Sequence, residues 1–254
     1  MTHPPLTRRA LIAALAAAPA AAALPAVAGR DRKAATEVSV VVELFTSQGC
    51  SSCPPADALL RELAATPGLL AMTYHVDYWD YLGWRDTFAS PEFTRRQKRY
   101  ARAQGGSVYT PQMIINGRHP VVGGNRAAVL RLIAAERKRA TCRQVPVSIQ
   151  HDKAAGMVSV HIGKAQEETP AGSATVWVAS MMPRATVAIA RGENGGRRLT
   201  YTNVVRHLMP AGMWKGEEMR LRLPGKELFV AGASQCMAIV QMDDYGPIIG
   251  AARL

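Results

Sequence analysis

The sequence predicts an α/β domain with a mixed sheet and helices on both of its faces, followed by a β-rich, sandwich-like domain. The first prediction comes from a buried strand that leads into a cysteine pair and from the alternating helix and strand patterns behind it. The second comes from evenly spaced short strand patterns with no helical pattern between them. We place the two domains at residues 37–142 and 143–254.

Ahead of these domains, residues 1–28 have the pattern of a signal peptide. Arg8 and Arg9 precede an alanine-rich apolar run, and Ala28 completes a small-residue cleavage site. Paired arginines are typical of twin-arginine export, with the general secretory route as the alternative. We expect a periplasmic or secreted protein with a linker at residues 29–36, and no later stretch is long and apolar enough to cross a bilayer.

The net charge of +12 raises the question of an anionic partner such as nucleic acid. The charge is dispersed, however, and the denser runs at residues 95–99 and 137–139 lie on predicted helices. A charge run on a helix usually faces solvent, and no nucleic-acid-binding motif accompanies these residues. We therefore expect no nucleic-acid partner.

The first domain opens with a strand at residues 38–45, an apolar run rich in β-branched residues. Residues 55–65 carry leucines on one face and predict an amphipathic helix. A second strand is expected at residues 69–76. The segment that follows, residues 74–109, holds 9 of the 15 aromatic residues and contains a helix start at Ser90-Pro91, so we expect a helical insertion there.

A hairpin and a helix complete this domain. Residues 112–115 and 120–122 flank Asn116-Gly117, a strong hairpin signal, and Asn125 caps a helix that runs to about residue 140. The order of strand, cysteine pair, helix, strand, insertion, hairpin and helix is that of the thioredoxin fold.

The β-rich part contains seven short strand candidates separated by Gly, Pro and polar clusters. They are residues 145–150, 157–162, 174–180, 186–191, 199–205, 219–223 and 236–242.

Cys50 and Cys53 carry the predicted chemistry. A Cys-x-x-Cys pair between a strand end and a helix N-terminus can exchange between disulfide and dithiol, because helix N–H groups favour a thiolate. We expect Cys50 to be exposed and to attack, and Cys53 to resolve the mixed disulfide. Pro54 and Pro55 place the pair in the lead-in to the helix. A structural disulfide and half of a zinc site are the alternatives.

Four segments of the sequence resemble one bacterial family. They are Glu43–Asp57 (ELFTSQGCSSCPPAD), and residues 75–84, 109–112 and 246–252. They are similar to the secreted proteins catalogued as domain-of-unknown-function family 1223, over essentially the whole mature chain. That family is placed in the thioredoxin-like superfamily, so the resemblance implies the fold, and it implies redox chemistry by analogy.

The same resemblance implies roles for three further residues. Pro111 is expected to be cis and to stack against the dithiol, with an ordinary trans proline as the alternative. Thr110 would offer its backbone to a bound peptide. Glu43 is the candidate for a buried acid that takes the proton of Cys53, with a structurally satisfied carboxylate as the alternative.

Aromatic residues of the insertion are candidates for substrate binding. Trp79, Tyr81 and Trp84 would form an apolar platform for an extended partner, or else the small core of the insertion itself. His75 with the cysteines suggests a copper site, although a lone histidine at a strand end is more often structural.

Cys142 and Cys236 complete an even number of cysteines, which favours disulfides in an exported protein. We predict a structural disulfide between them that joins the two domains, with two buried free thiols as the alternative.

Together these observations predict an exported thiol–disulfide oxidoreductase that needs no organic cofactor and no metal. Its partners would be cysteine-containing exported proteins or a redox partner. The alternatives are a non-catalytic binding protein of thioredoxin fold with a structural disulfide, and a copper-binding protein.

Overall fold

The computed structural model describes residues 1–2 and 38–254. The predicted signal peptide and the predicted linker therefore fall on residues outside that description. Residues 38–254 form one compact unit, built on an eight-stranded and a three-stranded sheet. Within the described residues, no helix has the length and apolar character needed to cross a membrane.

Four strands from the first part of the chain form one end of the large sheet. They are β1 (Val40–Thr46), β2 (Leu69–His75), β3 (Gln112–Ile115) and β4 (His119–Val122). Their spatial order is β2-β1-β3-β4, with β1 parallel to β2 and the other two pairs antiparallel. The sheet is mixed, as the sequence predicts, and the loops after β1 and β2 leave it at the same edge.

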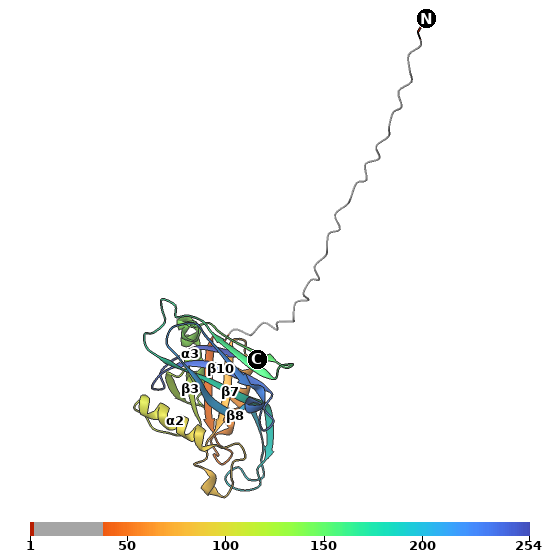
Figure 1. Ribbon diagram of the computed structural model, residues 1–254. Helices are drawn as coiled ribbons and strands as arrows, with labels where there is room; N and C mark the ends of the chain where they lie inside the picture. Colours follow the sequence, from red (N-terminus) through yellow and green to blue (C-terminus); the bar gives the residue numbers. More distant parts are fainter. Residues whose placement is uncertain (3–37) are drawn as a thin grey trace. The chain divides into compact units, whose positions relative to one another are not determined.

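Helices cover both faces of this sheet because side chains alternate along each strand. Val40, Val42 and Leu44 of β1 pack against helix α1 (Pro54–Ala64) and helix α3 (Arg126–Arg139). The intervening residues of β1 pack on the other face with Phe93 and Tyr100 of helix α2 (Pro91–Ala103). Figure 1 shows α3 above and α2 below the label of β3.

The C-terminal part of the chain extends the same sheet. Its strands are β7 (Ala174–Ala188), β8 (Arg198–Trp214), β10 (Gln235–Met242) and β11 (Ile248–Arg253). Pairing of Thr73 in β2 with Val204 in β8 makes the sheet continuous. The boundary predicted at residues 142–143 therefore falls within one sheet, and a separate β-rich domain stays a prediction.

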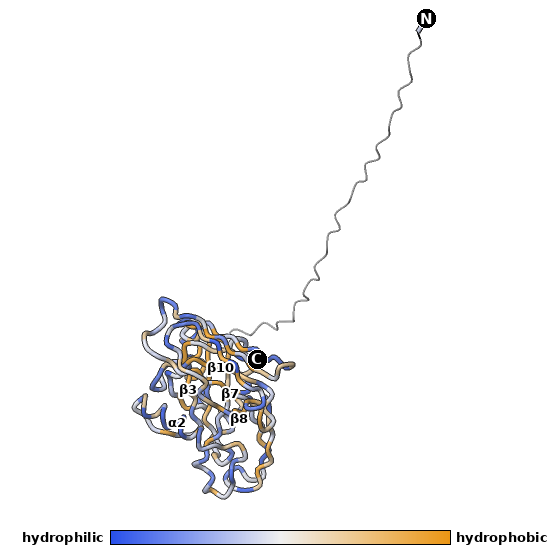
Figure 2. The backbone as a smooth tube through the Cα atoms, in the orientation of Figure 1, coloured by the Kyte–Doolittle hydropathy of each residue, from blue (hydrophilic) through white to orange (hydrophobic). Residues whose placement is uncertain are grey.

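A second, smaller sheet covers the C-terminal half of the large one. It consists of β5 (Val147–Asp152), β6 (Met157–Ile162) and β9 (Met219–Pro224), with the short helix α4 (Gly225–Leu228) after it. Val158 and Val160 of β6 share an apolar core with Val176 of β7 and Ala238 of β10. In Figure 2 the apolar residues concentrate in the strands, which is expected of strands buried between two layers.

Two of the predicted strands are segments of longer ones. Residues 174–180 and 186–191 belong to the single strand β7, and β8 continues past residue 205 to Trp214. Pro183 and Pro210 lie inside these strands, and β7 and β8 pair with two register shifts. Register shifts of this kind accommodate residues that interrupt regular pairing. The sequence analysis also missed β11.

The predicted disulfide between Cys142 and Cys236 is wrong: both residues are buried free thiols. Cys236 in β10 faces the core shared with the small sheet. Cys142 packs with Met237 and Ile239 in the core on the opposite face. Because the large sheet separates the two thiols, they cannot form a bond.

A buried ion pair ties the two parts of the chain together. Glu43 of β1 accepts a hydrogen bond of 2.7 Å from Arg96 Nε, and both side chains are at most 2% exposed. Arg96 also donates to Gln241 of β10 at 3.1 Å. Its guanidinium carbon lies 5.1–5.8 Å from the ring centroids of four aromatic side chains, which are Tyr74, Tyr100, Trp177 and Tyr245.

Replacing Glu43 by Gln should lower the free energy of unfolding by about 3–5 kcal/mol, because Arg96 is left as an uncompensated buried charge. Urea denaturation measures the change. Glu92→Gln is the matched control, since the Glu92–Arg95 pair is about 60% exposed and should contribute less than about 1 kcal/mol. Glu43→Gln combined with Arg96→Met should recover part of the loss, and equal losses in Glu43→Gln and Glu92→Gln would contradict this account.

Candidate functional site

A disulfide between Cys50 and Cys53 lies between the end of β1 and the start of α1. Cys53 is the residue before the helix, and Pro54 and Pro55 occupy its first two positions. The pair therefore lies in the lead-in to the helix, as the two prolines predict. Proline is tolerated there because the first N–H groups of a helix have no partner within it.

The expectation that Cys50 is exposed is wrong, because both cysteines are only 1% exposed. Two segments from elsewhere in the chain cover them. One is the end of the β7–β8 hairpin, residues 189–197, which we call the hairpin tip. The other is the segment between β2 and α2.

The hairpin tip is bound directly to the loop that carries the cysteines. Asn194 Nδ2 donates to the carbonyl oxygens of Gln48 at 3.0 Å and of Cys50 at 2.9 Å. The Glu193 carboxylate accepts from the Ser51 N–H at 3.1 Å. No local sequence pattern predicts these contacts, because Asn194 and Cys50 are 144 residues apart.

The segment after β2 covers the loop from the other side through Gln48, Trp79 and Trp84. Trp84 Nε1 donates to Gln48 Oε1 at 2.8 Å. Trp79 Nε1 donates to the Thr110 hydroxyl at 2.7 Å, and its Cβ and carbonyl lie against Gly49. Trp79 therefore links the cysteine loop to the loop that carries Thr110. Of the three predicted platform residues, Tyr81 is the one that is largely exposed, at 79%.

The Thr110–Pro111 peptide bond is cis, as the family resemblance implies. The Pro111 carbonyl accepts from Gly123 N–H at 2.9 Å. A Cβ placed on Gly123 would meet Ala56 at 3.0 Å and Pro111 at 3.3 Å. Pro111 is thus close to the first turn of α1, immediately after Cys53.

Glu43 does not lie where the predicted role as a base requires it. It points to the face of β1 that α2 covers, whereas α1 packs on the opposite face. Both of its carboxylate oxygens are engaged, one by Arg96 and the other by the Tyr100 hydroxyl. Glu43 is the structurally satisfied carboxylate that the sequence analysis kept as the alternative.

Asp57 is the buried acid behind the dithiol, and the sequence analysis missed it. It follows Cys53 by four residues, so both lie on one face of the helix start, and its N–H donates to the Cys53 carbonyl at 3.1 Å. The side chain is 7% exposed, and neither carboxylate oxygen has a hydrogen-bonding partner. Burial raises the pKa of Asp57 to about 7, against the opposing effect of nearby His75. The signal in the sequence was an acidic residue four positions after Cys53, which is ordinary in a first helical turn.

His75 lies beside Thr46 in the parallel pairing of β1 and β2. Its Nδ1 atom is 2.7 Å from Asp86 Oδ2, and its ring is in edge contact with Phe88 and Tyr201. Burial raises the pKa of Asp86, but the His75 imidazole and hydrogen bonds from Gln48 and Phe88 outweigh it and leave the pKa below the usual value.

Four buried side chains around this position retain polar atoms without partners, and we call them the polar cluster. They are Thr46, Asp57, His75 and Tyr201. Buried polar groups are almost always satisfied in proteins, so such a concentration makes these four residues candidates for a functional site.

The candidate ligands of a copper site are engaged by other groups. His75 is committed to Asp86 through Nδ1, and the two cysteines are bonded to each other. Across the part of the chain that the structure describes, no group of three or more His, Cys, Asp or Glu side chains is arranged to hold a metal ion.

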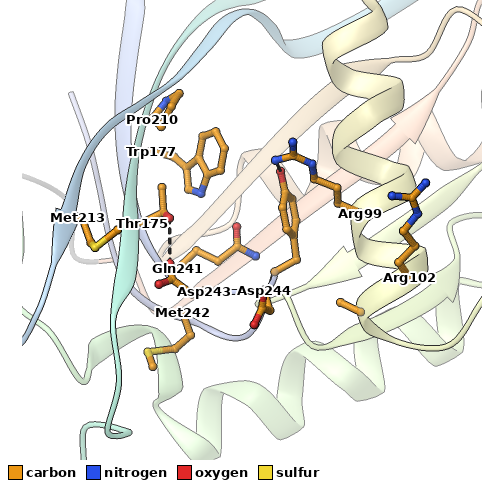
Figure 3. Close-up of a pocket in the computed structure, with 12 residues that line it drawn as sticks. Arg99, Arg102, Thr175, Trp177, Pro210, Met213, Gln241, Met242, Asp243 and Asp244 are labelled. Carbon is orange, nitrogen blue, oxygen red and sulfur yellow. Dashed lines mark hydrogen bonds between the residues drawn. The ribbon is translucent and has the colours of Figure 1, made fainter.

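A separate cavity of about 850 Å³ lies away from the cysteines. Arg99 and Arg102 of α2 line one side of the cavity and Trp177 lines another (Figure 3), and Tyr245 is a further lining residue. Both aromatic residues also contact Arg96, so the cavity adjoins the buried ion pair. None of the predicted site residues lines it.

The chain matches the model of the family described as "Protein of unknown function (DUF1223)" over residues 41–241. It belongs to this family. The match includes the loop that carries Cys50 and Cys53 (the dithiol loop), the loop that carries Thr110 and Pro111 (the proline loop) and the hairpin tip. Family membership and the site therefore involve the same residues. Among curated proteins, none matches the chain.

Two solved structures are similar to this DUF1223 protein. A crystal structure of a protein from Agrobacterium tumefaciens is 37% identical, with a TM-score of 0.74, covering 86% of this chain and 94% of that one. HBP35 of Porphyromonas gingivalis is 11% identical, with a TM-score of 0.59, covering 87% and 76%. At this low identity, the second likeness concerns the fold alone.

The raised pKa of Asp57 predicts how stability depends on pH. The pKa is about 7 in the folded state against an ordinary 3.8, so between these values the folded protein retains a proton that the unfolded chain has lost. The contribution of Asp57 is therefore most favourable below about pH 4 and falls by roughly 4 kcal/mol as the pH rises to about 7.

Asp57→Asn should remove this dependence. Urea denaturation at several pH values should show the variant gaining stability relative to the wild type between pH 4 and pH 7, by roughly 4 kcal/mol in total. A difference between the two proteins that is the same at every pH would contradict the assignment.

Proposed function

We propose that this protein is an exported, thioredoxin-like thiol–disulfide oxidoreductase that acts on cysteines of exported proteins. The observation that carries the proposal is the Cys50–Cys53 disulfide at the start of α1, with the unpaired carboxyl group of Asp57 one helical turn beyond Cys53. The cis-Pro111 beside the same turn supports it.

The exchange moves two electrons and two protons between the protein and its partner. A partner thiolate attacks Cys50 Sγ, the Cys50–Cys53 bond breaks, and Cys53 leaves as a thiolate. A second partner thiol then attacks the mixed disulfide and releases Cys50. The products are a partner disulfide and the reduced protein, and the reverse sequence reduces a partner disulfide.

Asp57 is placed to handle the proton of Cys53. When the protein is oxidised by a partner disulfide, the Asp57 carboxylate accepts the proton of the Cys53 thiol, which then attacks the mixed disulfide at Cys50. When Cys53 leaves as a thiolate, protonated Asp57 returns the proton. A pKa of about 7 suits both directions, because both forms of the acid are then present near neutral pH.

Substrate would approach the dithiol from the side of the proline loop and the segment after β2. Thr110 would pair with a partner strand through its backbone, and the exposed ring of Tyr81 would contribute apolar surface next to Trp79 and Trp84. The arginine pair at residues 8–9 supports export, and a disulfide is consistent with an oxidising compartment.

One observation favours a second candidate, a binding protein with a static disulfide. Both cysteines are 1% exposed, and structural disulfides are typically buried and resistant to reduction. In that case the segment after β2 or the second sheet would hold the partner. The copper-binding alternative has no comparable support.

The reduction potential of the Cys50–Cys53 pair separates these candidates. Equilibration with glutathione buffers, followed by thiol alkylation, should give a value between about −120 and −270 mV, the range of known dithiol catalysts. In parallel, Cys50→Ser should abolish mixed disulfides with exported proteins, whereas Cys53→Ser should trap them. A pair that remains oxidised below about −300 mV, with nothing trapped, would establish the static disulfide instead.

Asp57→Asn should slow resolution of the mixed disulfide at pH 7 on the order of 10²-fold, because the proton of Cys53 loses its acceptor. Stopped-flow measurement with a disulfide peptide reports this step. Glu43→Gln is the comparison: it should leave the step within about threefold, provided that the protein is folded at the working temperature. The opposite ranking would return the role of the base to Glu43.

A further inference from the structure

We infer that the hairpin tip is a gate over the Cys50–Cys53 disulfide, and that Asn194 is the side chain that holds the gate closed. This inference rests on the proposed function, for which it supplies the regulation of the same site.

The gate is needed because the dithiol is inaccessible in the closed form. Both cysteines are 1% exposed, and thiol–disulfide exchange requires a thiolate to approach the sulfur under attack. One of the covering segments must therefore move before any reaction. The segment after β2 is anchored to buried groups, since Gln48 N–H donates to Asp86 at 2.7 Å and Asp86 holds His75. The hairpin tip is held by three side-chain hydrogen bonds from Asn194 and Glu193, and Gly192 lies against Leu82 and Trp84.

The tip is attached to the dithiol loop through the side chains of two neighbouring residues. Asn194 is fully buried and donates to the carbonyl groups of Gln48 and Cys50, while the Glu193–Ser51 bond lies at the surface. Arg197 Nη1 donates to Asn194 Oδ1 at 2.8 Å and so orients the amide towards both carbonyl groups. Asn194 is thus the central attachment.

The tip is also a structure of its own, which lets it move as a unit. Ile189 and Arg197 close it, with the Ile189 N–H donating to the Arg197 carbonyl at 2.9 Å. Within the loop, Gly195 N–H donates to the Gly192 carbonyl and Arg197 N–H to the Asn194 carbonyl. These bonds do not involve the dithiol loop, so they survive when the tip lifts.

The closed gate also destabilises the reduced form of the protein, in which Cys50 is a thiolate. Glu193 occupies the Ser51 N–H, a donor next to Cys50 that would otherwise be free to stabilise a thiolate. Its carboxylate brings negative charge near the sulfur that becomes negative on reduction. Opening the tip therefore exposes Cys50 and at the same time frees a donor for its thiolate.

The test is the rate at which dithiothreitol reduces the Cys50–Cys53 disulfide, followed by alkylation and mass spectrometry. One dithiothreitol thiolate attacks Cys50, Cys53 leaves, and the second thiol closes the oxidised reagent and releases Cys50. Asn194→Ala removes two hydrogen bonds, each contributing several-fold to the closed state, so reduction should be about 30-fold faster. Asn125→Ala, which removes the exposed cap of α3, is the matched control and should leave the rate unchanged.

Hydrogen exchange distinguishes gate opening from loss of the fold. In Asn194→Ala the Ser51 amide should lose protection while the amides of β1 keep theirs. Should β1 lose protection as well, Arg197→Met is the second variant, since it removes only the contact that orients Asn194; it should accelerate reduction about fivefold.

Rates within twofold of the wild type, in a variant whose Ser51 amide exchanges freely, would overturn the gate. The gate and the proposed function fail under different outcomes. Accelerated reduction with a potential below about −300 mV would keep the gate and reject the oxidoreductase, and unchanged rates with a potential between about −120 and −270 mV would do the reverse.

Discussion

The buried pair of Glu43 and Arg96 is the interaction on which the rest of this structure depends. It joins β1, which leads directly to the dithiol, to helix α2 and, through Gln241, to β10 near the end of the chain. Such a pair is costly to desolvate, and its two charges are tolerable in the core because hydrogen bonds and aromatic rings surround them. The ion pair therefore connects the C-terminal strands to the first part of the sheet.

This placement has a chemical consequence at the other end of the molecule. Once β8 is paired with β2, its long hairpin with β7 extends to the dithiol loop, where Asn194 and Glu193 bind. The β-rich part of the chain is thus part of the site and contributes its cover. It also contributes Tyr201 to the polar cluster behind Cys53.

Local chemistry explains which site features the sequence could predict. The Cys-x-x-Cys spacing, the strand before it and the two prolines after it are short-range features, and so are the Thr110-Pro111 pair and the Asn116-Gly117 hairpin. Asp57 was equally local, one turn from Cys53, but an acidic residue in the first helical turn is ordinary, and only burial without a partner makes it unusual. Glu43 was selected by its place in the chain, and the alternation of β1 turned it to the wrong face.

The sequence by itself determined the position of the dithiol and most helix and strand positions in the first 142 residues, because each follows from residues close together in the chain. The cis-proline was expected from the family resemblance of the same short segments. Tertiary structure alone decided that the two parts share one sheet, that Cys142 and Cys236 lie on opposite faces of it, and that Asn194 covers Cys50. These outcomes depend on strand order and on the buried charge at Arg96, which connect residues more than 100 positions apart. No local pattern encodes such contacts, since they arise only when separate elements are packed together.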